Sequence, residues 1–187
     1  MMLLSSGLLL VTSSGCSMLV KQTYHAVKGA SGRYYEVEVV DAEALAEYGS
    51  IRFEPFTNAL GGHVPDELIA AIHERMPAEV EKADLFDGSD GPAVVVNGQI
   101  IHYNGRSGLK GALQSVMGVQ ECVCRVQLSD GDTGRRIGEA VCWSEVKSAV
   151  RRGAGELGEG VGKGMVKWLE DRLRPDEPTT DHTDTHR

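Results

Sequence analysis

The hydrophobic period changes along this chain, and that change constrains the fold more than any other feature. The stretch 34–40 alternates from residue to residue, which predicts a strand with one face buried. Tyr35, Val37 and Val39 lie on one face of it, and two glutamates lie on the other. A second run, residues 51–54, alternates in the same way. Two half-buried strands imply an antiparallel or mixed sheet that has one solvated face.

The period then lengthens to 3.6 over residues 65–84, which predicts an amphipathic helix. Pro65 suits the first helical turn, where its missing N–H costs nothing, and Asp66 and Glu67 favour the positive end of the helix dipole. Pro77 falls in the interior and removes a backbone hydrogen bond. We therefore expect a kink or two short helices at that position.

Further strands are expected in the second half of the chain. Residues 93–105 fit either one kinked strand or a tight hairpin that turns at Asn97 and Gly98, and we favour one long strand with a bulge. Residues 119–128 and 136–144 flank a segment rich in turn-forming Asp, Gly and Thr. These two stretches predict a β-hairpin.

The last element, residues 153–174, has apolar residues at helical spacing, but its first half is rich in glycine. Each glycine in a helix interior costs about 1 kcal/mol relative to alanine, so we expect the regular helix to begin only near Gly160. The small residues Ala154, Gly158 and Gly162 recur every four positions. They favour close packing on the sheet, with packing against another subunit as the alternative.

The element order predicts an α+β fold: a mainly antiparallel sheet of four to five strands with two helices packed on one face. The length suits a single domain. We expect a signal peptide over residues 1–15, a tether over 16–32, the folded domain over 33–174 and a disordered tail over 175–187.

The first twenty residues carry no charged side chain, which is typical of an export signal. Cys16 follows three small residues, 13–15, the context in which bacterial lipoproteins are cleaved and lipidated. We expect the mature chain to begin at Cys16 with lipid (palmitate among the acyl chains) on its sulfur. Ser17, the residue after that cysteine, resembles the sorting signal of lipoproteins that go to the outer membrane. The sequence therefore predicts an outer-membrane lipoprotein that faces the periplasm.

Two other interpretations of this segment stay open. Twenty apolar residues can span a bilayer as an uncleaved helical anchor. The positive residues Lys21, Lys28 and Arg33 follow the run, so the positive-inside rule would then keep the domain in the cytoplasm. An ordinary cleaved signal is the third interpretation, because Ser13 stands where lipoprotein signals usually have an apolar residue.

The net charge of −8 excludes some classes of partner. An acidic chain without a basic cluster is a poor ligand for nucleic acid, whose phosphates repel it. It is equally poor at binding anionic headgroups without a covalent anchor. We therefore expect attachment to the membrane through the N-terminal lipid, and protein partners or copies of the same chain as binding partners.

Several motifs together resemble an uncharacterised family of bacterial envelope lipoproteins. The sequence shows them in the runs ALAEYGSIRFEPF, VPDELIAAIHERM, VVVNGQIIHYNGRSG and CRVQLSDGDTGRRIGEA, followed by a terminal helix. The fold of that family is similar to the periplasmic domain of the lipoproteins that assemble curli secretion pores. The resemblance covers residues 34–174 and rests on strand endings and turns. It implies an α/β domain in the envelope and brings no established activity.

The three remaining cysteines are Cys122, Cys124 and Cys142. An oxidising compartment permits one disulfide among them. A hairpin symmetric about Asp132 places Cys142 opposite Cys122, which makes this pair the candidate disulfide. If the pairing of the two strands is shifted by one residue, Cys142 points to the other face of the sheet. The apolar residues Val141 and Trp143 favour this shifted register. The alternative to a disulfide is that all three are small buried hydrophobes.

No motif in the sequence indicates catalysis or a cofactor. His182 and His186 lie in the polar tail, and the aspartates near Asp87 and Asp130 lack the glutamate that completes a calcium loop. Ser107 has no identified base, and no zinc spacing, phosphate loop or dinucleotide fingerprint is present. We predict a non-enzymatic interaction or assembly domain without metal or cofactor. The alternative is a small secreted enzyme or ligand-binding domain.

Overall fold

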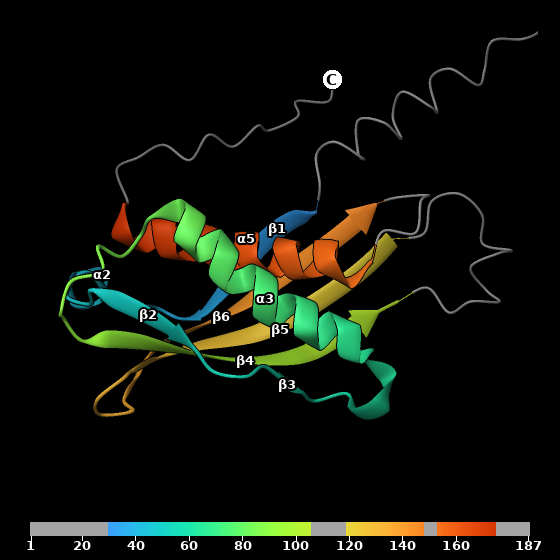
Figure 1. The fold of residues 1–187 in the computed structure, drawn as a ribbon, viewed down its shortest axis with the longest axis horizontal. Coiled ribbons are helices and arrows are strands. Elements are labelled where there is room, and N and C mark those ends of the chain that lie inside the picture. The colour runs from blue at the N-terminus through green and yellow to red at the C-terminus, as the bar shows by residue number, and fades with distance from the viewer. Residues whose placement is uncertain (1–29, 106–118, 148–152, 175–187) are drawn as a thin grey trace, which may run out of the picture.

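A computed structural model describes residues 30–105, 119–147 and 153–174 (Figure 1). Its elements in chain order are β1 (Ser31–Glu38), α2 (Ala42–Ala46), β2 (Ser50–Phe53), β3 (Thr57–Asn58), a 3-10 turn (Gly61–His63), α3 (Asp66–Ala83), β4 (Ala93–Asn104), β5 (Val119–Asp130), β6 (Arg136–Lys147) and α5 (Ala154–Leu173). The N-terminal segment with Cys16 and the C-terminal tail lie outside the described residues.

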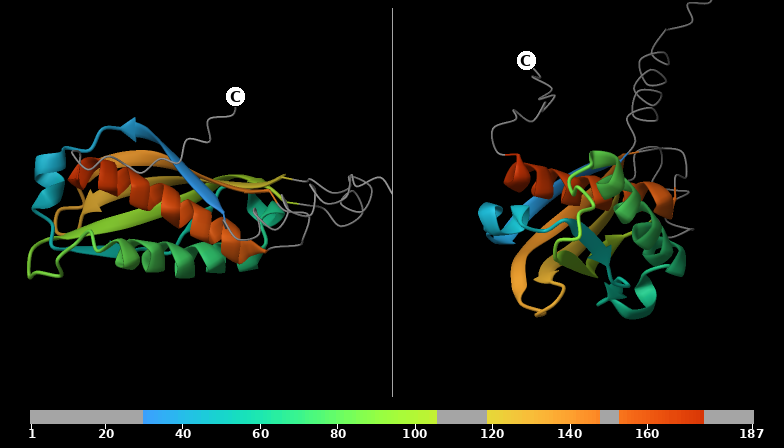
Figure 2. Two further views of the ribbon diagram at one scale, coloured as in Figure 1. Left: turned by 90° about the horizontal axis from the view of Figure 1, so that it is seen from above. Right: turned by 60° about the vertical axis from the view of Figure 1, so that its left-hand side comes forward.

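The strands form one mixed sheet in the order β1-β6-β5-β4-β2, and β3 also pairs with β4. Pairing is antiparallel throughout, except that β2 and β3 run parallel to β4. Helices α3 and α5 pack together against one face of this sheet (Figures 1 and 2). The expected α+β class is confirmed. The sheet has six strands rather than four to five, because the two-residue strand β3 gives no periodic signal.

The long strand β4 and the β5–β6 hairpin form the middle of the sheet. β4 is continuous, and its pairing with β5 shifts between Ile100 and His102, so the expected single strand with a bulge is confirmed. The hairpin is also confirmed. Its turn is closed by the Asp130 N–H, which donates to the Arg135 carbonyl at 2.8 Å, and by Gly134 with a φ of +69°. The Asp130 carboxylate accepts hydrogen bonds from the backbone of Asp132 and Thr133.

Helix α3 buries the apolar stripe that the sequence predicts. Its buried residues are Leu68, Ile72, Met76 and Val80. The expectation of two short helices is wrong, because α3 runs as one helix through Pro77. Pro77 is only half-buried, whereas the preceding Met76 is fully buried, so the apolar stripe is continuous across the proline.

Helix α5 begins at Ala154, six residues before the expected start, and the glycines in its interior face closely packed neighbours. A Cβ on Gly158 would lie 2.7 Å from the Ala71 carbonyl oxygen in α3. On the other side, a Cβ on Gly164 would lie 2.5 Å from the Arg33 carbonyl oxygen in β1. The glycines therefore let one helix approach both α3 and the sheet, and this packing compensates the loss of helix propensity. The expected close packing on the sheet is confirmed for Gly160 and Gly164, whereas Gly158 and Gly162 pack against α3.

Candidate functional site

The covered face of the sheet holds all three described cysteines, in a register that the sequence did not predict. Cys124 lies opposite Cys142, and Cys122 lies opposite Ser144. The placement of Cys142 opposite Cys122 is therefore wrong, and so is the slide that would point Cys142 away. The turn spans residues 131–134, and Ile137 is an extra residue in β6. Together these two features shift the register, so that the residue opposite Cys142 is Cys124 instead of Cys122, two positions along β5 on the same face.

The cysteine side chains are buried, and their surroundings suppress their reactivity. The Cys122 and Cys124 sulfurs lie 3.9 Å apart. This contact, together with burial, raises the pKa of the Cys124 thiol, and burial alone raises the pKa of Cys142 to about 12. All three are free thiols in the structure, and the Cys122–Cys142 disulfide remains a prediction without a test. A buried thiol with a raised pKa is a poor nucleophile, which counts against Cys124 and Cys142 as attacking groups in the folded domain.

Strand β1 forms one edge of the sheet, and three apolar residues face solvent there, two on the strand and Val39 directly after its end. Tyr35, Val37 and Val39 are 56%, 59% and 69% exposed, and we call these three residues the β1 edge patch. The Tyr35 ring lies 6.5 Å from that of Trp143 on β6, centroid to centroid. Large exposed apolar residues on an edge strand mark a surface that is available for pairing with another chain.

The opposite face of β1 is half-buried under α5, which supplies partners for its polar groups. Glu36 accepts hydrogen bonds from Trp168 Nε1 at 3.0 Å and from Arg172 Nε at 2.9 Å. Tyr34 donates its hydroxyl to Asp171, and burial together with this hydrogen bond raises the pKa of Tyr34 to about 12. A carboxylate that is bonded in this way can be buried without a large penalty. The exposure of the β1 edge patch is thus the consequence of a polar contact between β1 and α5.

A network of charged side chains lies on the open face of the sheet, around Glu139. Glu139 is only 6% exposed, and it accepts a hydrogen bond from Gln127 Nε2 at 2.7 Å. It also pairs with Arg125 at 3.3 Å and with Arg136 at 3.2 Å, while Arg136 reaches Glu38 on β1 at 2.7 Å. The network links three strands, and the two arginines balance the two carboxylates. It is therefore a structural element of the sheet with little charge left over for a ligand.

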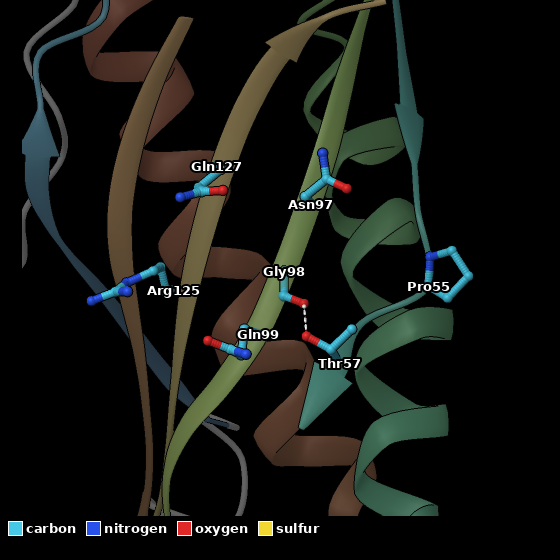
Figure 3. Close-up of a pocket in the computed structure, with 7 residues that line it drawn as sticks. All are labelled: Pro55, Thr57, Asn97, Gly98, Gln99, Arg125 and Gln127. Atoms are coloured by element: carbon cyan, nitrogen blue, oxygen red, sulfur yellow. Dashed lines mark hydrogen bonds between the residues drawn. The ribbon is translucent and has the colours of Figure 1, made fainter. Parts of the chain in front are cut away.

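Beside this network the open face has a shallow polar hollow of about 340 Å³ (Figure 3). Its lining residues are Pro55, Thr57, Asn97, Gly98, Gln99, Arg125 and Gln127. The Asn97 and Gln99 amides lie on β4, two residues apart and therefore on one face, next to Gln127 on β5. Thr57 donates its hydroxyl to the Gly98 carbonyl at 3.3 Å. Amides can both donate and accept, so the hollow suits a polar, uncharged group.

The described part of the chain brings together no residues that form a candidate metal site. Within it, no cluster of three or more His, Cys, Asp or Glu residues could hold a metal ion. None of its helices is long and apolar enough to cross a bilayer. Asp130 serves its turn and accepts a hydrogen bond from the Tyr48 hydroxyl at 2.7 Å, so turn formation explains this aspartate. Asp87 likewise accepts from the backbone N–H of Ser89.

The sequence did not identify the β1 edge patch, although one signal for it was present. Alternation shows that the two faces of a strand differ, but it does not show which face is buried. Gly32 is in phase with Tyr34 and Glu36, and a glycine in a strand often marks close approach of another backbone. A Cβ on Gly32 would lie 2.2 Å from the Gly160 carbonyl oxygen in α5. Gly32 is therefore the signal in the sequence that indicates which face of β1 is covered.

Comparison with solved structures shows a distant similarity in fold. A PelC variant dodecamer from Paraburkholderia phytofirmans is 8% identical, with a TM-score of 0.47 over 75% of this chain and 96% of that chain. A second PelC dodecamer from that organism is 10% identical, with a TM-score of 0.41 over the same shares. A PDZ domain protein from Parabacteroides distasonis is 8% identical, with a TM-score of 0.36 over 79% of this chain and 38% of that chain.

No protein-family model matches this sequence, and no curated protein matches it either. The structural similarities concern the arrangement of strands and helices, and the assembly of the PelC structures is a property of those proteins. The resemblance to envelope lipoproteins that the sequence motifs indicate therefore remains a prediction.

Proposed function

We propose that this chain is a non-enzymatic, lipid-anchored protein of the bacterial envelope that binds protein partners or further copies of itself through strand β1. The observation that carries the proposal is the exposure of the β1 edge patch, with Val39 the most exposed of its residues at 69%. The patch begins close to the predicted tether, residues 16–32.

The chemistry of an exposed edge strand supports this function. Its outward N–H and C=O groups can pair with an added strand, while apolar side chains on alternate residues supply contact area. Proteins usually protect such edges with charged residues or proline. Here the solvent-facing positions between Tyr35 and Val39 carry an aromatic ring and two valines. This edge is consistent with a role in binding another chain.

Two experiments test the proposal separately. Intact mass and cell fractionation of the native chain and of Cys16→Ala test the anchor: a mature chain that begins at Cys16 with acyl groups, and is lost in the variant, is expected. Site-specific photo-crosslinking from Val37 tests the surface, with Glu67 in the exposed first turn of α3 as the matched control position. Crosslinks from Val37 alone are expected. Equal crosslinking from both positions, or none from Val37, would overturn the role of β1.

The second candidate function is binding of a small polar ligand in the hollow at Asn97, Gln99 and Gln127, which its convergent amides favour. NMR titration with neutral sugars and with acetate tests it. Saturable shifts confined to these residues, absent in Gln99→Ala, would support this function. Unchanged spectra with every probe would refute it for these ligand classes.

A further inference from the structure

Three thiols lie together on the covered face of the β5–β6 hairpin, and one pair of them stands in register for a disulfide. Cys124 on β5 is directly opposite Cys142 on β6. Residues directly opposite in an antiparallel pair have α-carbons about 4.5–5.5 Å apart, depending on the hydrogen-bonding type of the pair. Both values lie inside the range of about 4.4–6.8 Å that a disulfide spans.

The other two pairings do not fit this geometry. Cys122 is opposite Ser144, so its relation to Cys142 is diagonal, and diagonal neighbours are about 7–8 Å apart. Cys122 and Cys124 are two residues apart on one extended strand, which separates their α-carbons by about 6.6 Å and points both side chains the same way. That spacing is at the outer limit for a disulfide, and the strand would have to leave its extended conformation to close the bond.

We propose that Cys124 and Cys142 are the site of a cross-strand disulfide, and that Cys122 remains a buried thiol beside it. The oxidant is the disulfide of a thiol oxidoreductase or of oxidised glutathione. One cysteine thiolate attacks it and releases one reduced thiol, and the second cysteine then attacks the mixed disulfide and releases the other. The protein loses two electrons and two protons, and the oxidant gains them. In the cell this step rests on the proposed envelope location, which supplies the oxidant.

The fold decides when the bond can form. All three cysteines have no exposed surface, and α5 packs over both strands. The thiolate is the attacking species, and the raised pKa values of Cys124 and Cys142 suppress it in the folded domain. Oxidation therefore precedes closure of the core, while the hairpin is open to the oxidant. Once formed, the bond is protected from reductants by the same burial.

The test uses the full chain with Cys16→Ala, unfolded and then refolded in a glutathione redox buffer. Free thiols are blocked with N-ethylmaleimide in denaturant, and the chain is digested with trypsin. Cleavage gives peptide 111–125 with Cys122 and Cys124, and peptide 137–147 with Cys142. Mass spectrometry is expected to find these two peptides linked. Blocking of all three cysteines as free thiols after refolding would overturn the proposal.

Single alanine variants in the same background identify the pair. The link between the two peptides is expected to persist in Cys122→Ala and to be lost in Cys124→Ala and Cys142→Ala. Persistence in Cys124→Ala would mean that Cys122 is the true partner, which would overturn the proposal. Cys122→Ala also reports on stability: its oxidised form is expected to unfold at higher urea concentration than the form reduced with dithiothreitol, because the bond closes the hairpin loop.

Mass mapping of the chain expressed in a bacterium separates this proposal from the proposed location. A Cys124–Cys142 link in material isolated from the envelope supports both. Reduced thiols in the cell, with a link after refolding in glutathione, support the pairing and count against an oxidising compartment. A link that forms in neither material overturns the pairing whatever the location of the protein.

Discussion

The packing of α5 predicts that two glycine-to-alanine substitutions in one helix will change stability in opposite directions. Gly164 faces β1, where a Cβ would lie 2.5 Å from the Arg33 carbonyl oxygen and 3.2 Å from the Arg33 backbone nitrogen. Gly155 is the second residue of the helix, with no neighbouring atom within 4 Å of the place of its Cβ. Both substitutions add the same methyl group, so the difference between them isolates the packing.

The expected magnitudes follow from two opposing effects. Alanine in place of glycine stabilises a helix by up to about 1 kcal/mol, and Gly155→Ala should show most of this gain. In Gly164→Ala the gain is outweighed, because overpacking typically costs about 1–3 kcal/mol and the opposing atoms are backbone, which cannot rotate away. We therefore expect Gly164→Ala to lose up to about 2 kcal/mol, and the two variants to differ by roughly 1–3 kcal/mol.

Urea unfolding followed by far-UV circular dichroism measures this difference, with equal slopes required for the comparison. A Gly164→Ala variant as stable as Gly155→Ala would refute the close approach of α5 to β1. A loss of stability in Gly155→Ala would contradict a helix that begins at Ala154 with open space beside its second residue.

Three further outcomes follow from the polar contacts. Glu36→Ala leaves the buried Trp168 N–H without its acceptor, so urea unfolding should show a loss of about 1–3 kcal/mol. Glu38→Ala, the control at the partly exposed pair with Arg136, should lose less than about 1 kcal/mol. Equal losses in the two variants would contradict the role of Glu36 as a buried acceptor. Hydrogen bonds from Thr133 and Tyr48 lower the pKa of Asp130. The carboxylate therefore contributes stability above its usual pKa of about 4, and this contribution is lost as the pH falls below that value. Acid unfolding of Asp130→Asn checks this, because the variant should lack that part of the pH dependence. The raised pKa of Tyr34 contributes stability below pH 10 that is lost as the pH rises towards about 12, and Tyr34→Phe should remove this alkaline part of the stability curve.

The periodic elements of the fold were predictable because each is set by local sequence. The stripe on α3 and the strands of the β5–β6 hairpin follow from the spacing of apolar residues alone. Helix α2 and strand β3 were missed because five and two residues are too few to establish a period. The parallel pairing of β2 with β4 could not be predicted from the sequence either, since it depends on the path of the intervening helix α3.

The candidate site was less predictable, because its features depend on contacts between distant residues. Which face of β1 is buried is decided by Glu36 and its partners on α5, 132 and 136 residues away. The partner of Cys142 depends on the length of the turn and on the extra residue at Ile137, which shift the register without any change in apolar pattern. The hollow lies where the short strand β3 pairs with β4, and neither feature has a sequence signature.

The contact between β1 and α5 joins the first and last described elements of the chain, with Tyr34 and Asp171 separated by 137 residues. A chain that is synthesised or threaded through a membrane from its N-terminus emerges with β1 long before its covering helix. Until α5 arrives, Glu36 has no Trp168 to bond and the sheet has no cover on that side. The domain therefore completes its fold only when nearly all of the chain has emerged.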